Sequence, residues 1–120
     1  MIFPVEVVLK GRDFAVTENL VISHGEPNTW NDTSVQALLV EVLRAIDRAQ
    51  NPDAPKDRIV VLHGFSWIVE PLEGKVVLAI EIPMGAAVAG PFDIDQKVFT
   101  EMIERVLKAE RAFLAPSTVH

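Results

Sequence analysis

Each of the two stretches with helical periodicity in this chain follows a pair of stretches typical of β-strands, and this order constrains the fold most strongly. The expected strands span 2–10, 14–23, 58–70 and 75–83, and the expected helices span 33–50 and 93–113. Strands that are neighbours in sequence pair as hairpins, and the intervening helices cover the sheet. The sequence therefore predicts a two-layer α+β fold of ββαββα order, with a four-stranded antiparallel sheet and two helices on one face. At 120 residues, the chain is expected to form a single domain, 1–120.

The two halves of the chain also align without a gap when each residue is matched with the residue 60 positions later. Apolar positions of the first helix then coincide with apolar positions of the second, as Leu38 does with Val98 and Ile46 with Val106. Identical pairs are few. A duplicated ββα unit is therefore a hypothesis, and the ββαββα order is the broader prediction.

Both expected helices begin at polar stretches suited to capping. The stretch TSVQ at 33–36 has the pattern of a capping box, in which a hydroxyl oxygen and an amide satisfy the first free backbone N–H groups. The stretch DIDQ at 93–96 offers carboxylates for the same purpose.

The turn between the third and fourth expected strands sets the register of that hairpin. The stretch PLEGK at 71–75 favours a three-residue loop that ends in its glycine. In that register Trp67 lies opposite Ala79, and His63 becomes a diagonal neighbour of Glu81 on the same face. A four-residue loop would shift the register by one residue and place His63 and Glu81 on opposite faces.

His63 and Glu81 are the candidate catalytic residues. A histidine that is oriented by a carboxylate can act as a general base. The sequence shows no nucleophile motif, third ligand or oxyanion-hole signature beside them. We therefore favour the alternative, a buried histidine that is satisfied by one acidic neighbour.

The loop between the second strand and the first helix contains further candidate ligand-binding residues. His24 and Glu26 form an H-x-E pair of two metal-ligand types, but a solvated loop is the favoured interpretation, so no metal site is predicted. Trp30 in this loop and Trp67 in the third strand could stack on a ligand ring. A tryptophan on a half-buried strand is more often part of the core.

The stretch MGAAVAGP at 84–91 carries almost no large side chain and is expected to be a loop. It precedes a helix, but it matches no phosphate-binding motif, has no lysine and leads into two aspartates that would repel an anion. Gly85 and Gly90 allow close approach of another backbone, so we expect a packing or interface surface. The wall of an apolar pocket is the secondary interpretation, with these two glycines as candidate ligand contacts.

Composition excludes several classes of function. A formal net charge of −6 and a pI near 4.9, without a cluster of Lys and Arg, speak against nucleic-acid binding. The absence of cysteine removes disulfides, thiolate metal sites and cysteine nucleophiles. No apolar run approaches the length of a bilayer span, and the first residues do not form a signal peptide. We expect a cytoplasmic protein without a cofactor and without membrane contact.

The chain contains more apolar surface than this fold can cover. Polar residues form only a narrow stripe on the helix at 33–50, and the strand at 58–70 is apolar on both faces. We therefore expect a homodimer. Its interface is predicted to be the helix at 33–50 or one sheet face, with 84–91 at the rim; the residues assigned to that sheet face are Val61, Phe65, Trp67, Val77 and Ala79.

Two hypotheses about function follow. The first is a non-catalytic homodimeric module that binds a partner protein or a small apolar ligand. The second is a small enzyme or metal-binding protein that uses His63 and Glu81 with His24 and Glu26. A metal or ligand retained through purification would favour the second hypothesis.

Overall fold

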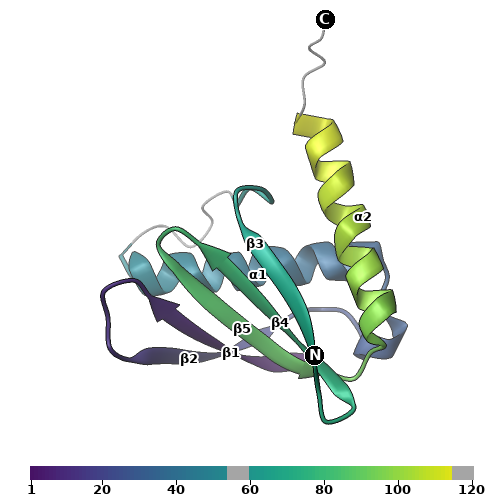
Figure 1. The fold of residues 1–120 in the computed structure, drawn as a ribbon, viewed down its shortest axis with the longest axis horizontal. Coiled ribbons are helices and arrows are strands. Elements are labelled where there is room, and N and C mark those ends of the chain that lie inside the picture. The colour runs from purple at the N-terminus through teal and green to yellow at the C-terminus, as the bar shows by residue number, and fades with distance from the viewer. Residues whose placement is uncertain (54–59, 115–120) are drawn as a thin grey trace, which may run out of the picture.

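The computed structural model contains one five-stranded antiparallel sheet and two helices in the order ββαβββα (Figure 1). It describes residues 1–53 and 60–114, with side chains to residue 110. The strands follow the spatial order β2-β1-β5-β4-β3. The elements are β1 (Ile2–Leu9), β2 (Ala15–Val21), a short 3₁₀ turn (Pro27–Thr29), α1 (Asp32–Gln50), β3 (Ser66–Leu72), β4 (Lys75–Ile82), β5 (Gly85–Phe92) and α2 (Gln96–Leu114).

The α+β class is confirmed, but the prediction of four strands is wrong. The stretch at 84–91, expected to be a loop, forms most of β5, which pairs with β1 on one side and with β4 on the other. Its small residues fit this central position, since a Cβ on Gly85 would lie 2.6 Å from the backbone oxygen of Val8. The second half therefore has three strands and the first has two. The ββαββα order and the duplicated ββα unit are not matched.

The hairpin of β3 and β4 has a two-residue turn, which neither predicted loop length anticipated. Glu73 and Gly74 both have positive φ angles, of 50° and 84°, as a type I′ turn requires. Leu72 therefore pairs with Lys75, and Trp67 pairs with Ile80 instead of Ala79. This shift by one residue turns Trp67 towards the helices.

Both helices begin at a different residue from the predicted one. The Oδ1 atom of Asn31 accepts a hydrogen bond from the N–H of Ser34 (3.0 Å), and the Oγ atom of Ser34 accepts one from the N–H of Asn31 (3.2 Å). This capping box precedes the predicted one by two residues and starts α1 at Asp32. The Oδ2 atom of Asp95 accepts from the N–H of Val98 (3.1 Å), and α2 starts at Gln96.

The core lies between one face of the sheet and the two helices. Helix α1 crosses behind the sheet, and α2 packs against α1 and β3 (Figure 1). The rings of Trp30 and Phe92 lie 5.2 Å apart, and Phe3 and Phe99 extend this aromatic cluster. The unexpectedly apolar circumference of α1 is thus covered on one side by the sheet and on another by α2. The structure gives no reason to place the predicted dimer interface on this helix.

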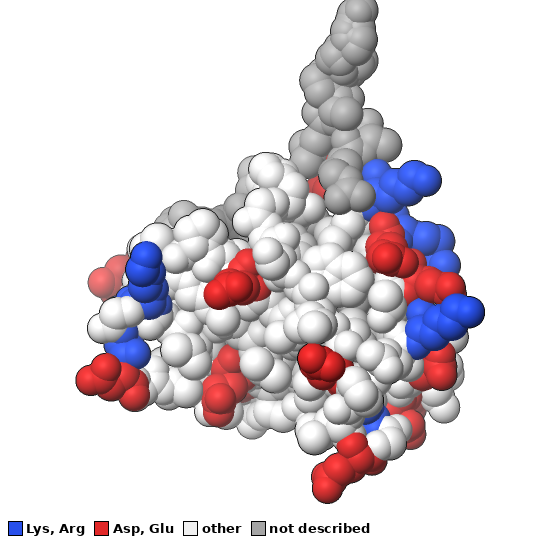
Figure 2. Space-filling model, viewed as in Figure 1, with Lys and Arg blue, Asp and Glu red and all other residues white. Residues whose placement is uncertain are grey.

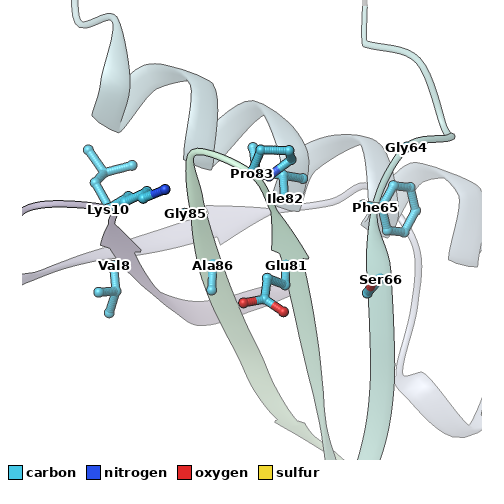
Figure 3. Close-up of a pocket in the computed structure, with 11 residues that line it drawn as sticks. Val8, Lys10, Gly64, Phe65, Ser66, Glu81, Ile82, Pro83, Gly85 and Ala86 are labelled. Atoms are coloured by element: carbon cyan, nitrogen blue, oxygen red, sulfur yellow. The ribbon is translucent and has the colours of Figure 1, made fainter.

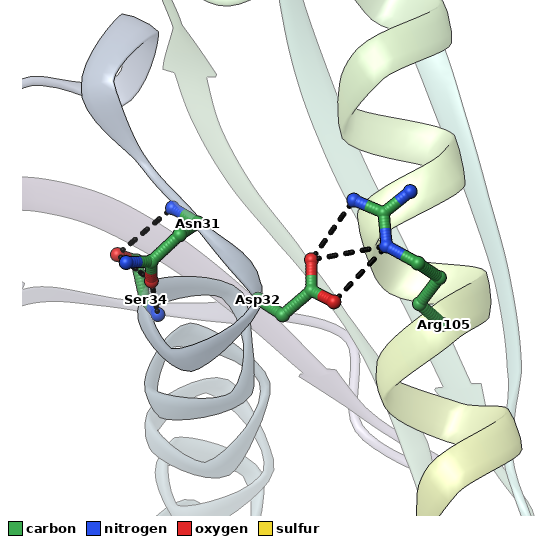
Figure 4. A network of polar contacts seen from close by, with 4 residues as sticks. All are labelled: Asn31, Asp32, Ser34 and Arg105. Carbon is green, nitrogen blue, oxygen red and sulfur yellow. Dashed lines mark hydrogen bonds and ion pairs between the residues drawn. The ribbon is translucent and has the colours of Figure 1, made fainter.

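A bidentate ion pair joins the two helices at one end. Arg105 of α2 donates from Nη2 and Nε to the carboxylate of Asp32 at the start of α1 (2.9 and 3.0 Å; Figure 4). Hydrogen bonding to the Arg105 guanidinium lowers the pKa of Asp32, since it favours the charged carboxylate. This exposed contact links the two helices and lies outside the candidate site described below. Neither α1 nor α2, as far as the chain is described, combines the length and apolar composition of a membrane-spanning helix.

Candidate functional site

The face of the sheet that points away from the helices is the main apolar surface of the described chain. Ten large apolar side chains are exposed among the described residues, and the strand alternation places six of them on this face: Ile2, Val8, Val21, Ile68, Leu72 and Val88. Figure 2, in the same view as Figure 1, shows this face as largely uncharged, with a few separate acidic residues. We call this surface the open face.

The strand register arranges the side chains of the open face in rows across the strands. One row runs Val8, Ala86, Glu81, Ser66, and the next runs Glu6, Val88, Ala79, Ile68. The middle of the face therefore carries small residues between larger ones. A depression of about 310 Å³ lies over Ala79 and Ala86, between Ile68 and Val88.

A wider groove of about 740 Å³ continues this depression towards the β4–β5 turn (Figure 3). The depression and the groove share Ser66, Glu81 and Ala86. Lys10, which follows β1 directly, lies on one side of the groove, and Glu81 of β4 lies towards the other. The two side chains make no hydrogen bond or ion pair with any described residue.

The contact predicted between His63 and Glu81 does not form. His63 is exposed and lies in the segment before β3, because that strand begins only at Ser66 instead of residue 58. Residues 58 and 59 lie outside the described residues. Glu81 is exposed on the open face, and the one-residue register shift removes the diagonal relation on which the prediction depended.

The loop at 24–30 does not bring its candidate residues together. His24 is half-buried and Glu26 is exposed, and neither side chain makes a hydrogen bond with the described residues. Trp30 instead belongs to the core, where its Nε1 donates to the backbone oxygen of Gly25 (2.8 Å). Across 1–53 and 60–114, no three His, Cys, Asp or Glu residues gather as a group that could hold a metal ion.

The other candidates lie in the sheet. Trp67 is half-buried on the helix side, so it cannot share a surface with Val77 and Ala79 as the predicted dimer interface required. Val61 and Phe65 of that interface precede β3. Gly85 lines the wider groove.

Gly90 adopts a φ of 115° at the irregularity in the pairing of β4 and β5. A Cβ on Gly90 would lie 3.1 Å from the backbone oxygen of Val76. This glycine is therefore explained by backbone geometry.

Four residues that line the groove or the depression were not predicted as site residues: Lys10, Val8, Ile68 and Val88. The alternation of 2–9 already indicates that Val8 faces away from the core. Val88 could be assigned to the same face only once 85–92 was known to be a strand. Ile68 needed the correct hairpin register.

Both edge strands of the sheet have features that disfavour pairing with a strand of another molecule. On β3, Pro71 lacks an N–H, and Gln96 of α2 donates from Nε2 to the backbone oxygen of Val69 (3.0 Å). On β2, Glu18 points towards the helices and binds Arg48 of α1. Proline, covered backbone groups and inward-pointing charges all disfavour edge-to-edge association.

Comparison of the chain with protein-family models, with curated proteins and with solved structures finds no match.

Proposed function

We propose that this chain is a non-catalytic interaction module that buries the open face of its sheet in a homodimer. The observation that carries the proposal is the concentration of exposed Ile, Leu and Val side chains on that face. An antiparallel sheet with one solvated face usually carries polar residues there. A concentration of exposed apolar side chains on one face is typical of an association site.

The size of the open face is compatible with a dimer. Five strands spaced by about 4.8 Å, each about 25 Å long, present about 600 Å² per copy. Two copies would bury about 1,200 Å², which is the lower end of the range for specific interfaces. The guarded edges of β2 and β3 favour association through the face over association through the edges.

Substitution of Ile68 by lysine tests this proposal. Ile68 is 51% exposed, so Ile68→Lys should leave the fold intact, but it would place an ammonium group within the interface, on the edge strand β3. Light scattering at micromolar concentration should give about twice the 13.3 kDa chain mass for the parent and the monomer mass for the variant. The matched control is Val98→Lys on α2, where the native side chain is 47% exposed.

Two outcomes would contradict the proposal. One is a parent chain that remains monomeric at micromolar concentration, and the other is an Ile68→Lys variant that dimerises as well as the parent. If the depression over Ala79 instead binds a small apolar ligand, the chain would stay monomeric and the added ligand would protect it against unfolding. No contact among the described residues unites His63, Glu81, His24 and Glu26. The alternative of an enzyme or metal-binding protein therefore has no assembled site to support it.

A further inference from the structure

We propose that the twofold axis of this dimer runs along β5, so that Lys10 of each copy pairs with the partner's Glu81. The inference rests on the proposed function, since it assumes that the open face is the interface. The occupant of the groove beside Glu81 is then a second copy of this chain, and each copy completes the charge pairing of the other.

The register of the sheet leads to this arrangement. β5 is the central strand, with β1 on one side and β4 on the other. A twofold axis along β5 places β1 over the partner's β4, row for row. Val8 then lies opposite the partner's Glu81, and Glu6 lies opposite the partner's Ala79. No carboxylate faces another carboxylate in its own row.

The crossing angle of packed sheets selects Lys10 as the partner of Glu81. Before any crossing, the partner's Glu81 lies opposite Val8, midway between Lys10 and Glu6 along β1. Two sheets that pack face to face with aligned strands cross at about −30°. With β1 to the left of β4, as in Figure 3, this rotation moves the partner's Glu81 towards Lys10 and away from Glu6. The extended Lys and Glu side chains can together span the distance of about 10 Å between packed sheets.

The residues along the axis allow the close approach that this arrangement requires. The outward side chains of β5 include Ala86 and Val88, and each would meet its own copy near the axis. An axis across the strands would instead place β1 over the partner's β1. If that axis passes through the middle of β4, at the row of Leu78 and Val5, Glu6 lies about two residue steps from the partner's Glu6, and their like charges would repel.

Charge reversal tests the pairing. The dimer dissociation constant, measured by sedimentation equilibrium, should rise about tenfold or more in Lys10→Glu and in Glu81→Lys, because each variant places like charges together twice per dimer. The double variant Lys10→Glu with Glu81→Lys should return to within about threefold of the parent, since it restores both pairs. The matched controls Lys97→Glu and Glu104→Lys, exposed on α2, should leave the constant unchanged.

The outcomes separate this inference from the proposed function. If Ile68→Lys abolishes the dimer while the Lys10 and Glu81 reversals have no effect, the open face is the interface and the arrangement is wrong. The arrangement is also wrong if both single reversals weaken the dimer and the double variant does not recover. An axis across the strands would place β4 over the partner's β4 in the reverse direction and bring Glu81 near the partner's Lys75, so weakening by Lys75→Glu instead of Lys10→Glu would indicate that axis. A monomeric parent chain would overturn the proposed function itself.

Discussion

The two faces of the same five strands differ in the size and the charge of their side chains. The face towards the helices carries fully buried residues such as Phe3, Leu78 and Ile80. The open face carries Ala, Val, Ile and one Leu, with single glutamates between them, as Glu81 is between Ala86 and Ser66. Large interdigitating side chains are what a permanent core requires. A smaller apolar surface with interspersed charge is compatible with a surface that is covered by association.

The comparison also separates two apolar surfaces that look alike in the sequence, because each is larger than the predicted fold could cover. The apolar circumference of α1 is covered within the chain by the sheet and by α2. The apolar residues of the open face have no described element above them. Only the second surface therefore remains as an argument for association.

The largest expected difference between the faces comes from truncating one apolar side chain on each. Leu78→Ala, on the covered face, should lower the free energy of unfolding by about 2–5 kcal/mol, because it leaves a cavity in the core. Ile68→Ala, on the open face, should change it by only about 0.5 kcal/mol in the dissociated monomer. Urea denaturation at a protein concentration below the dimer dissociation constant measures both. Equal losses would mean that the open face is packed within the monomer.

Enlarging the small residues of β5 sharpens the comparison within one strand. Ala89→Leu, whose native side chain is fully buried towards the helices, should cost about 1–3 kcal/mol through overpacking. Ala86→Leu, three residues earlier and on the open face, should change monomer stability by only about 0.5 kcal/mol and should weaken the dimer. Urea denaturation and light scattering on the same pair of variants provide the measurements. An Ala89→Leu variant as stable as the parent would show that helix packing on β5 is looser than described.

The smallest expected effect concerns the exposed ion pair between Asp32 of α1 and Arg105 of α2. Folding lowers the pKa of Asp32, so the folded chain binds protons less readily than the unfolded chain. The stabilising contribution is therefore present above the ordinary pKa of 3.8 and is lost as the pH falls through the lowered pKa of the folded state. Asp32→Asn should slightly lower the thermal midpoint at pH 7, with no effect on dimerisation. The difference from the parent should disappear at low pH, and its persistence there would assign the effect to something other than this carboxylate.

The secondary structure could be predicted wherever a periodic pattern carries it. Alternation in 2–9 and 75–82 and the 3.6-residue period of both helices are local properties, and these elements formed close to the expected places. β5 has no such pattern, and its small residues also have weak strand propensity of their own. It becomes a strand through hydrogen bonds to β1 and β4 on both sides.

The candidate site depended on details that local patterns do not specify. A change from a three-residue to a two-residue turn moved Trp67 to the helix side and removed the relation between His63 and Glu81. Trp30, predicted as a candidate ligand contact, instead lies in the aromatic core beside Phe92. Glu81 and Gly85 do line the wider groove, but their place there does not follow from the predicted register.

The sequence by itself determined the α+β class, the pairing of neighbouring strands and the acidic character of the chain, since these follow from local periodicity and composition. Only the tertiary structure decided that the glycine- and alanine-rich stretch is the central strand, that α1 is covered by α2, and that the open face remains uncovered by described residues. The physical reason is that small side chains specify little by themselves. Their place is set by the backbones that approach them, and those backbones come from parts of the chain far away in sequence.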